Sequence, residues 1–422
     1  MKGDYQELVD EISALLGAPA TLENRDFRLI AFGAHDSDDD LAMDPVRTRS
    51  ILTRQSTAAV RSWFEGFGIT RATGPVRIPA APEAGVFRGR ICLPVRHRGI
   101  VHGYVWLLDR DGPRATDGAE PGPGPAALAA AMAVAERIGR QLAAEARAGA
   151  DLSRELAAAL TAAPGPARER ALAALARALG EPEPGSAEGR GEGGSEGAAG
   201  APGAAYALVC VDPWQGEAPA SVPGAVAVAS VAVPAAGTPG GPGPTGGLMG
   251  GGAGRTALAV LVRPRGTELP AATLAAVERV REAEPGRTAG VSYGRPGPAW
   301  LPGTWEQAVA AARAARARPG LGPVARWSAI GPYRMLSVLA ARGGEDPATR
   351  ELLGPAHPEL ARTAEVFLDC AGQAGRAAAA LGIHRQTLYY RLERVERLTG
   401  LDLDEGEDRL LLHMAIKAAR LR

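Results

Sequence analysis

The stretch AGRAAAALGIHRQTLYYRLERVERLT, from Ala374 to Thr399, decides the fold of the C-terminal part of this chain. Small residues followed by Gly382 predict a first helix that ends in a sharp reversal, because glycine tolerates the positive φ that such a turn needs. After the turn, apolar residues recur at spacings of four, three and three, which predicts a second helix with one apolar stripe. The stripe consists of Leu388, Leu392, Val395 and Leu398.

The opposite side of the predicted second helix is polar and aromatic. At about 100° per residue, that side collects a set of exposed-type residues: Gln386, Tyr390, Glu393 and Arg397, flanked by Tyr389 and Arg394. Two interpretations are open. The pair is an ordinary amphipathic helix hairpin in a helical domain, or its second helix is held against a compact support while the polar side enters a DNA groove.

A longer match favours the second interpretation. The segment IHRQTLYYRLERVERLTGLDL resembles the C-terminal module of the PucR-type (CdaR-like) transcription regulators of bacteria, whose pattern is close to HR-N-TL-x-YRL followed by L-x-G-x-D-L. The upstream ELARTAEVFLDCAGQAGRAAAAL resembles the start of the same module. The matching positions are His384, Arg385, Thr387, Leu388, Tyr390, Arg391, Leu392, Leu398, Gly400, Asp402 and Leu403.

This chain departs from the family pattern at two places. Gln386 stands where asparagine is usual, and Gln373-Ala374-Gly375 replaces the usual Gly-Asn pair. Glutamine can pair bidentately with adenine as asparagine does, so the chemistry of base recognition survives while the preferred base or the reach changes.

The resemblance implies a DNA-binding helix with distinct roles along it. We expect Arg385, Gln386, Tyr389 and Tyr390 to reach base edges, and Thr387, Arg391 and Arg394 to grip phosphates or fix the register. For Arg391 a structural ion pair with an acid of the preceding helix is an equal alternative, because it lies beside the apolar stripe. His384 either contacts DNA or caps the helix.

The charge balance restricts how DNA is held. Lys and Arg number 47, as do Asp and Glu, so the chain has no overall basic field and any DNA contact depends on a local patch. The predicted second helix supplies four arginines, whereas an acidic run from Asp402 to Asp408 follows it and is expected to face away from phosphates. The modest affinity implied for one subunit favours a homodimer that reads two half-sites.

Cysteine usage and hydropathy indicate the compartment. Cys92, Cys210 and Cys370 form no CxxC motif and are flanked by apolar or small residues, which predicts buried free thiols in a reducing cytoplasm. The first residues, MKGDYQELVDEISALL, carry acids unlike a signal peptide, and no apolar run approaches the roughly 18 residues of a membrane span. We therefore expect a soluble cytoplasmic protein.

The N-terminal part predicts a small sensor domain. Tyr5–Leu16 is amphipathic, with Leu8, Ile12, Leu15 and Leu16 on one face, and two short strands follow around Asn24-Arg25-Asp26. A helix is expected around Pro45–Phe67, and then a hairpin about Arg98-Gly99. This order resembles a GAF-like sensor fold, which implies a small-molecule pocket or a dimerisation platform; His97 and His102 either line that pocket or are plain surface residues.

A helical and then a mixed region follow. A long helix is predicted from Pro125 to about Ala163 and another from Ala167 to Leu179, closed by Gly180. Glu181–Ala204 and Ala235–Gly254 are too rich in glycine, proline and alanine to order themselves. Strands are expected at Ala205–Asp212, Ala225–Val233, Thr256–Val262 and Ala289–Gly294, and helices at Leu269–Arg281 and Thr304–Ala317, the last with Thr304 as its cap.

These elements resemble the central GGDEF-like domain of the same regulators, through GVSYGRP and WEQAVAAARAA. A nucleotide cyclase of that kind needs a GG[DE]EF hairpin, and the only similar string is Gly343-Gly344-Glu345-Asp346-Pro347. Because Pro347 is unsuited to a strand, the string reads as a helix stop followed by a helix start. We therefore expect a catalytically inactive transmitter.

The sequence as a whole predicts a multidomain α+β protein: a GAF-like α/β sensor (1–112), a helical linker (113–163), a degenerate GGDEF-like α/β domain (164–325) and an all-α C-terminal domain (326–422) with a helix-turn-helix at about 358–422. The expected function is sequence-specific, effector-responsive regulation of transcription on double-stranded DNA. The alternative is a nucleotide-signalling enzyme that uses the helix-turn-helix only as a partner surface. Six scattered histidines offer no catalytic or metal-binding constellation, so no enzyme activity, cofactor or metal is expected.

Overall fold

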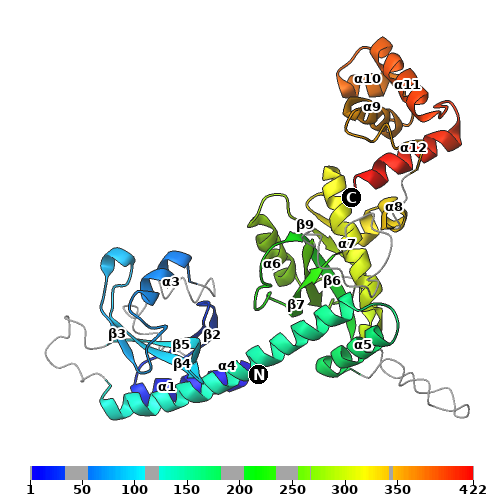
Figure 1. Ribbon diagram of the computed structural model, residues 1–422. Helices are drawn as coiled ribbons and strands as arrows, with labels where there is room; N and C mark the ends of the chain where they lie inside the picture. The colour runs from blue at the N-terminus through cyan, green and yellow to red at the C-terminus, as the bar shows by residue number, and fades with distance from the viewer. Residues whose placement is uncertain are drawn as a thin grey trace, which may run out of the picture. The chain divides into compact units, whose positions relative to one another are not determined.

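The computed structural model describes residues 2–33, 56–109, 123–181, 204–233, 255–266, 268–341 and 346–421. The chain divides into two compact units, Met1–Ala148 and Gly149–Arg422. The architecture is mixed α+β with a helical C-terminal region, as the sequence predicts (Figure 1). The low-complexity segments and the string at 343–345 lie outside the described residues, as do residues 45–55 of the helix expected at Pro45–Phe67; the described remainder contains a helix at Ala58–Glu65.

The first unit is built on a five-stranded antiparallel sheet of order β2-β1-β5-β4-β3. Its strands are β1 (Thr21–Asn24), β2 (Leu29–Phe32), β3 (Val76–Ile78), β4 (Arg90–His97) and β5 (Ile100–Leu108). Helix α1 (Lys2–Leu16) packs with the first part of α4 (Pro125–Thr161) in one core cluster with these strands. Gly139 of α4 lies so close to β4 that a Cβ would stand 2.2 Å from the Arg96 carbonyl oxygen, which makes glycine necessary there.

A second cluster of this unit is aromatic. Phe27, Phe64, Tyr104 and Trp106 are buried together, and Phe64 belongs to α3 (Ala58–Glu65). The short η2 (Pro82–Ala84) lies between β3 and β4. The hairpin about Arg98-Gly99 is confirmed, since these residues join β4 and β5 with φ of 47° and 81°.

One detail of the predictions for this unit is corrected. Leu8, Ile12 and Leu16 are buried as expected, but Leu15 is 40% exposed, because it falls off the face of α1 that meets the sheet. His97 and His102 lie half-buried at the hairpin, and neither lines the hollow of about 390 Å³ in this unit. Burial, and then the neighbouring His97, lower the pKa of His102 below its ordinary value.

The second unit contains a sheet domain, which we define as α5 (Pro166–Leu179) through α8 (Tyr333–Ala341). Its strands are β6 (Ala205–Trp214), β7 (Ala225–Ala232), β8 (Thr256–Val262), β9 (Thr288–Val291), β10 (Arg295–Pro296) and β11 (Val324–Arg326). The order is β11-β9-β6-β8-β7, with β10 paired to β6; only β11 and β9 pair in parallel. The strands predicted at 205–212, 225–233 and 256–262 are confirmed within two residues, whereas the one expected at Ala289–Gly294 ends at Val291.

Helices bury both faces of this sheet. The end of α4, α5 and α7 (Leu301–Ala317) share one core cluster, and α6 (Ala271–Glu282) belongs to the other. Gly290 of β9 touches α7, where a Cβ would lie 2.0 Å from the Ala308 carbonyl oxygen. Thr304 is not a helix cap: α7 begins at Leu301, and the Thr304 hydroxyl donates to the Trp300 carbonyl at 2.7 Å from within the first turn.

After η3 (Pro298–Trp300) and α7, the chain passes through η4 (Pro319–Leu321) and η5 (Trp327–Ala329) to α8. The remaining helices are α9 (Pro358–Asp369), α10 (Ala374–Leu381), α11 (Arg385–Thr399) and α12 (Gly406–Ala419), which share a core of their own. Cys92 and Cys210 are buried free thiols as predicted, but Cys370 at the end of α9 is half-buried. No helix among the described residues is long and apolar enough to cross a membrane.

Candidate nucleic-acid interface

The turn between α10 and α11 is built as the sequence predicts. Gly382 ends α10 in the left-handed conformation with φ of 66°, and its N–H donates to carbonyls of the last turn. His384 is then the N-cap of α11, because its Nδ1 accepts the backbone N–H of Gln386 at 3.3 Å. This bond satisfies one of the free donors at the helix start and fixes where α11 begins.

The apolar stripe of α11 faces the core of the helical domain. Leu388 and Val395 are fully buried, Leu392 is nearly so, and Leu398 is half-buried against the same cluster. Ala377 and Ala378 of α10 are buried beside them, whereas Ala379 and Ala380 are exposed. The close approach of α10 to the core of the helical domain therefore depends on two of the four alanines, Ala377 and Ala378.

The other side of α11 is open to solvent. Tyr389 and Tyr390 are 53% and 58% exposed, unusual values for tyrosine in a folded domain. The remaining exposed side chains on this surface, which we call the outer face of α11, are Arg385, Gln386, Thr387, Glu393, Arg394 and Arg397. The N-terminal end of α11 lies in the same stretch, and a helix N-terminus attracts anions such as phosphate.

The charged groups of the outer face are largely unneutralised. Among the described residues Arg394 has no ion-pair partner, and the nearest group to Arg385 is the Tyr389 hydroxyl, 3.4 Å from its Nη2. Arg397 pairs only loosely with Glu393, at 3.8 Å between exposed side chains. Such groups remain available to phosphates and base edges.

Residues 360–418 match the family model of the PucR C-terminal helix-turn-helix domain. These residues are similar to the PucR helix-turn-helix, and we call the helical domain that contains them (α9 to α12) the PucR-type domain. The match includes α10, the Gly382 turn and α11, and it ends within α12. The resemblance in the sequence is thereby confirmed for this domain, and the match does not extend to the sheet domain or to the first unit.

Two proteins with a named regulatory role are similar to part of this chain. The DNA-binding transcriptional activator AdeR of Bacillus subtilis (strain 168) is 26% identical over 108 residues, which are 25% of this chain and 24% of the activator. The carbohydrate diacid regulator of Escherichia coli (strain K12) is 60% identical over 38 residues, 9% of this chain and 10% of the regulator. The chain thus spans at most about a quarter of either relative, and both are regulators by name.

A solved structure was also matched. It is the regulator of polyketide synthase expression from Bifidobacterium adolescentis, 21% identical, covering 52% of this chain and 82% of that one. Its TM-score of 0.23 is too low to carry any conclusion about the arrangement of this chain.

Arg391 differs from its neighbours on the PucR-type helix. Its guanidinium lies 3.4 Å from Glu359 and 3.5 Å from the Thr363 hydroxyl, and its side chain is only 24% exposed. The structure therefore contains the ion pair that was one of the two alternatives. The acid comes from α9 rather than from the immediately preceding helix α10, because α9 crosses beneath α11.

Sequence reasoning missed the ion-pair network that joins α9 to α12 in the PucR-type domain. Lys417 Nζ donates to Glu365 Oε1 and to Asp369 Oδ2, both at 2.8 Å, and His413 Nε2 lies 2.9 Å from Asp369 Oδ1. Arg420 pairs with the second oxygen of Glu365. The signal in the sequence was the spacing of four between the two acids and between His413 and Lys417, which places each pair on one helix face.

Hydrogen bonds within the network shift the pKa of Asp369 and the pKa of Lys417. Burial alone would raise the pKa of Asp369, but hydrogen bonds from Lys417 and His413 hold it below its ordinary value. Burial would likewise lower the pKa of Lys417, and its bonds to Asp369 and Glu365 raise it instead. The ion pair between Asp369 and Lys417 is therefore formed throughout the neutral range.

The sheet domain contains a carboxylate in a very different setting. Asp212 is buried, its Oδ1 accepting from Arg255 Nε at 2.8 Å and its Oδ2 from Arg316 Nη1 at 3.0 Å. Burial lowers the pKa of the adjoining Arg313, and the negative charge of Asp212 offsets part of this lowering. Within the described residues, no three acids, histidines or cysteines come close enough to hold a metal ion.

Proposed function

We propose that this protein is a sequence-specific DNA-binding regulator of transcription, acting in the cytoplasm as a homodimer that responds to a small-molecule effector. The observation that carries the proposal is the outer face of α11: it has exposed tyrosines, an exposed Gln386 and two arginines, Arg385 and Arg394, without a carboxylate partner among the described residues, on a helix held by its buried stripe. The PucR-type domain match and the two named regulators support the DNA partner. The proposals of a small-molecule effector and of a homodimer rest on the family resemblance.

Roles along the helix follow from exposure and partners. Arg385, Gln386, Tyr389 and Tyr390 occupy its first turns and are exposed, which suits contact with base edges in the major groove. Thr387 and Arg394 suit phosphate contacts. Arg391 is committed to Glu359, so we assign it to holding α11 on α9, and His384 to capping α11.

We further propose that residues 1–112 of the first unit form the GAF-like sensor and that residues 164–325, which include most of the sheet domain, form an inactive GGDEF-like transmitter, the two being joined by the helical linker (113–163). The sheet of each unit, with helices packed on it, supports this division. The signalling-enzyme alternative gains no support from the two named relatives, and the buried acid Asp212 is held by two arginines rather than left open.

Selection of DNA from a random duplex pool by the full chain tests the proposal. Wild-type protein should enrich a two-part motif, because a dimer reads two half-sites. Gln386→Ala should change the preferred base at one position of each half, by roughly 1–3 kcal/mol of lost discrimination. Arg394→Ala should keep the motif, weaken binding to every sequence alike and lower the salt dependence by about one ion.

The matched control is Arg170→Ala, which removes an exposed arginine from α5 without touching α11. It should leave both motif and affinity unchanged. Failure of the wild-type chain to enrich any motif would refute sequence-specific binding. Identical titrations for wild type, Gln386→Ala and Arg394→Ala would show that α11 is not the reading helix.

A further inference from the structure

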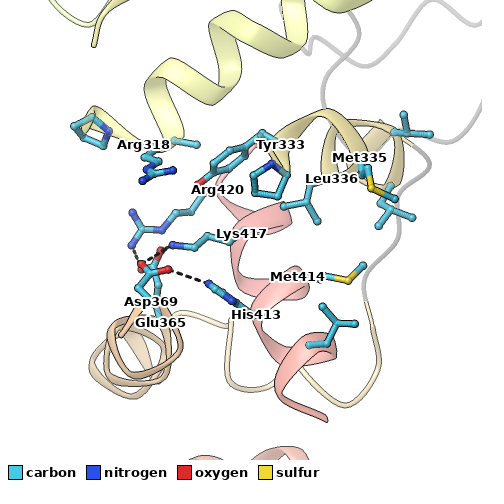
Figure 2. A pocket seen from close by; sticks show the side chains of 16 residues that line it. Arg318, Tyr333, Met335, Leu336, Glu365, Asp369, His413, Met414, Lys417 and Arg420 are labelled. Atoms are coloured by element: carbon cyan, nitrogen blue, oxygen red, sulfur yellow. Dashed lines mark hydrogen bonds and ion pairs between the residues drawn. The ribbon is translucent and has the colours of Figure 1, made fainter. Parts of the chain in front are cut away.

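A hollow of about 1190 Å³ lies within the second unit, where the sheet domain meets the PucR-type domain. Its walls come from the end of α7, from α8, and from α9 and α12, as Figure 2 shows. Pockets that hold small molecules have volumes of about 300–1,000 Å³. The hollow is therefore large enough for a small ligand with an extended body.

One wall of the hollow is apolar and exposed. Met335, Val338 and Leu339 of α8 are 77%, 53% and 43% exposed, and Leu410 of α12 is 60% exposed. Met414 lines the same wall (Figure 2). Exposed apolar side chains clustered in this way mark an interaction surface or a ligand-binding groove. Methionines adapt their shape to varied apolar ligands.

The other end of the hollow is polar, with a positive charge in excess. Its two carboxylates, Glu365 and Asp369, are both occupied by Lys417, with Arg420 and His413 taking the remaining oxygens. Arg318 lines the same hollow and is exposed, and its guanidinium has no hydrogen bond or ion pair to any described residue (Figure 2). Three permanently charged cations, Arg318, Lys417 and Arg420, thus share this hollow with two carboxylates.

We propose that this hollow binds an apolar monocarboxylate, with the carboxylate on Arg318 and the hydrocarbon body along α8 and α12. An anion fits because the acids already have partners and one guanidinium does not, and arginine pairs bidentately with a carboxylate. A neutral amphiphile would leave that charge uncompensated, and a cation would meet the excess positive charge. Tyr333, whose ring lies at the same end, adds a second polar group near the head (Figure 2).

Such a ligand would contact both domains at once. Arg318 and α8 belong to the sheet domain, whereas Leu410 and Met414 belong to α12 of the PucR-type domain. A ligand that binds one arrangement of the two domains better than another shifts the population toward it. Binding itself is independent of the proposed function; only an effect of the ligand on DNA affinity rests on it.

Calorimetric titration of the full chain with sodium decanoate, and separately with the neutral decanol, tests the proposal. Wild type should bind decanoate at one site. Arg318→Gln should weaken decanoate at least tenfold, which is about 1.4 kcal/mol, and leave decanol unchanged. Val338→Asp should weaken decanoate tenfold or more, because it places a carboxylate in the exposed apolar wall without disturbing the core.

Arg279→Gln is the matched control, since Arg279 is an exposed arginine on α6 that does not line the hollow. It should change neither titration. Absence of decanoate binding in wild type, or equal decanoate affinity in wild type and Arg318→Gln, would overturn the proposal. So would sedimentation showing that Val338→Asp turns a dimer into a monomer while decanoate still binds, because the wall would then be a face between two copies. None of these results would alter the outcome of DNA selection, so the two proposals fail separately.

Discussion

Arginines on α11 of the PucR-type domain and arginines around Asp212 in the sheet domain have opposite surroundings. Arg385 and Arg394 extend from an exposed helix face with no carboxylate partner among the described residues, whereas Arg255 and Arg316 hold both oxygens of a buried acid. The same side chain therefore serves as a free cation for an external anion in one region and as internal compensation in the other. A count of basic residues cannot separate the two, and the difference is the physical basis for placing DNA contact on α11.

The largest effect is expected where the arginines are paired. Asp212→Ala leaves Arg255 and Arg316 close together without their carboxylate, and removing one partner of a buried ion pair should lower the free energy of unfolding by roughly 3 kcal/mol. Urea unfolding followed by tryptophan fluorescence measures this. Glu217→Ala, which removes an exposed acid just after β6, should change it by less than about 0.5 kcal/mol. Equal effects of the two substitutions would contradict the assigned role of Asp212.

The network of Lys417 extends the comparison into the PucR-type domain, because there too the charges are paired. Lys417→Met should lower stability by roughly 1–3 kcal/mol, since it removes hydrogen bonds to two carboxylates. Arg362→Met on α9 is the matched control, because it removes an exposed charge that has no ion-pair partner among the described residues.

The same network predicts a dependence of stability on pH. The pKa of Asp369 is lowered in the folded state, so its contribution is present above the ordinary value of about 3.9 and is lost as pH falls through the lower folded pKa. The pKa of Lys417 is raised, so its contribution is present below about 10.4 and is lost as pH rises through the higher folded pKa. The free energy of unfolding should be measured across both pH ranges. In Lys417→Met, the loss of stability at low pH and the loss at high pH should both be smaller than in the wild type.

A smaller effect separates the two kinds of arginine on α11 itself. Arg391→Ala should lower stability by about 0.5–1 kcal/mol, because it breaks a partly exposed ion pair to Glu359. Arg394→Ala should leave stability within about 0.5 kcal/mol and act on DNA affinity alone. Thermal unfolding and DNA titration of both variants provide the measurement. If Arg394→Ala destabilised the chain as much as Arg391→Ala, Arg394 would not be a free cation.

The smallest expected effect concerns the start of α10. Gln373 is its N-cap residue and makes no capping hydrogen bond with its side chain. Gln373→Asn supplies a shorter amide that suits this position, and should raise stability by roughly 0.5 kcal/mol. Gln386→Asn, on the outer face of α11, should give no such gain in the same unfolding assay, whatever it does to the DNA sequence preferred.

Local pattern alone predicted much of the candidate site. The period of the apolar residues fixed α11 and its buried stripe, Gly382 fixed the turn, and the remaining positions formed the exposed face. The strands β6, β7 and β8 were equally predictable, because short apolar runs between glycine-rich segments leave few other choices. In each case the information lies within a few residues of the element itself.

Contacts between distant segments could not be read in this way. Asp212 meets Arg255 and Arg316, which are 43 and 104 residues further along the chain. Likewise Arg391 finds Glu359 on α9, and the hollow exists only because α8 and α12 lie side by side (Figure 2). The sequence by itself determined where α11 lies and which of its side chains are buried or exposed. The tertiary structure decided which charged side chains have an oppositely charged partner and which do not. Such partners come from elements far apart in the chain, and their separation in the sequence does not predict which elements pack together.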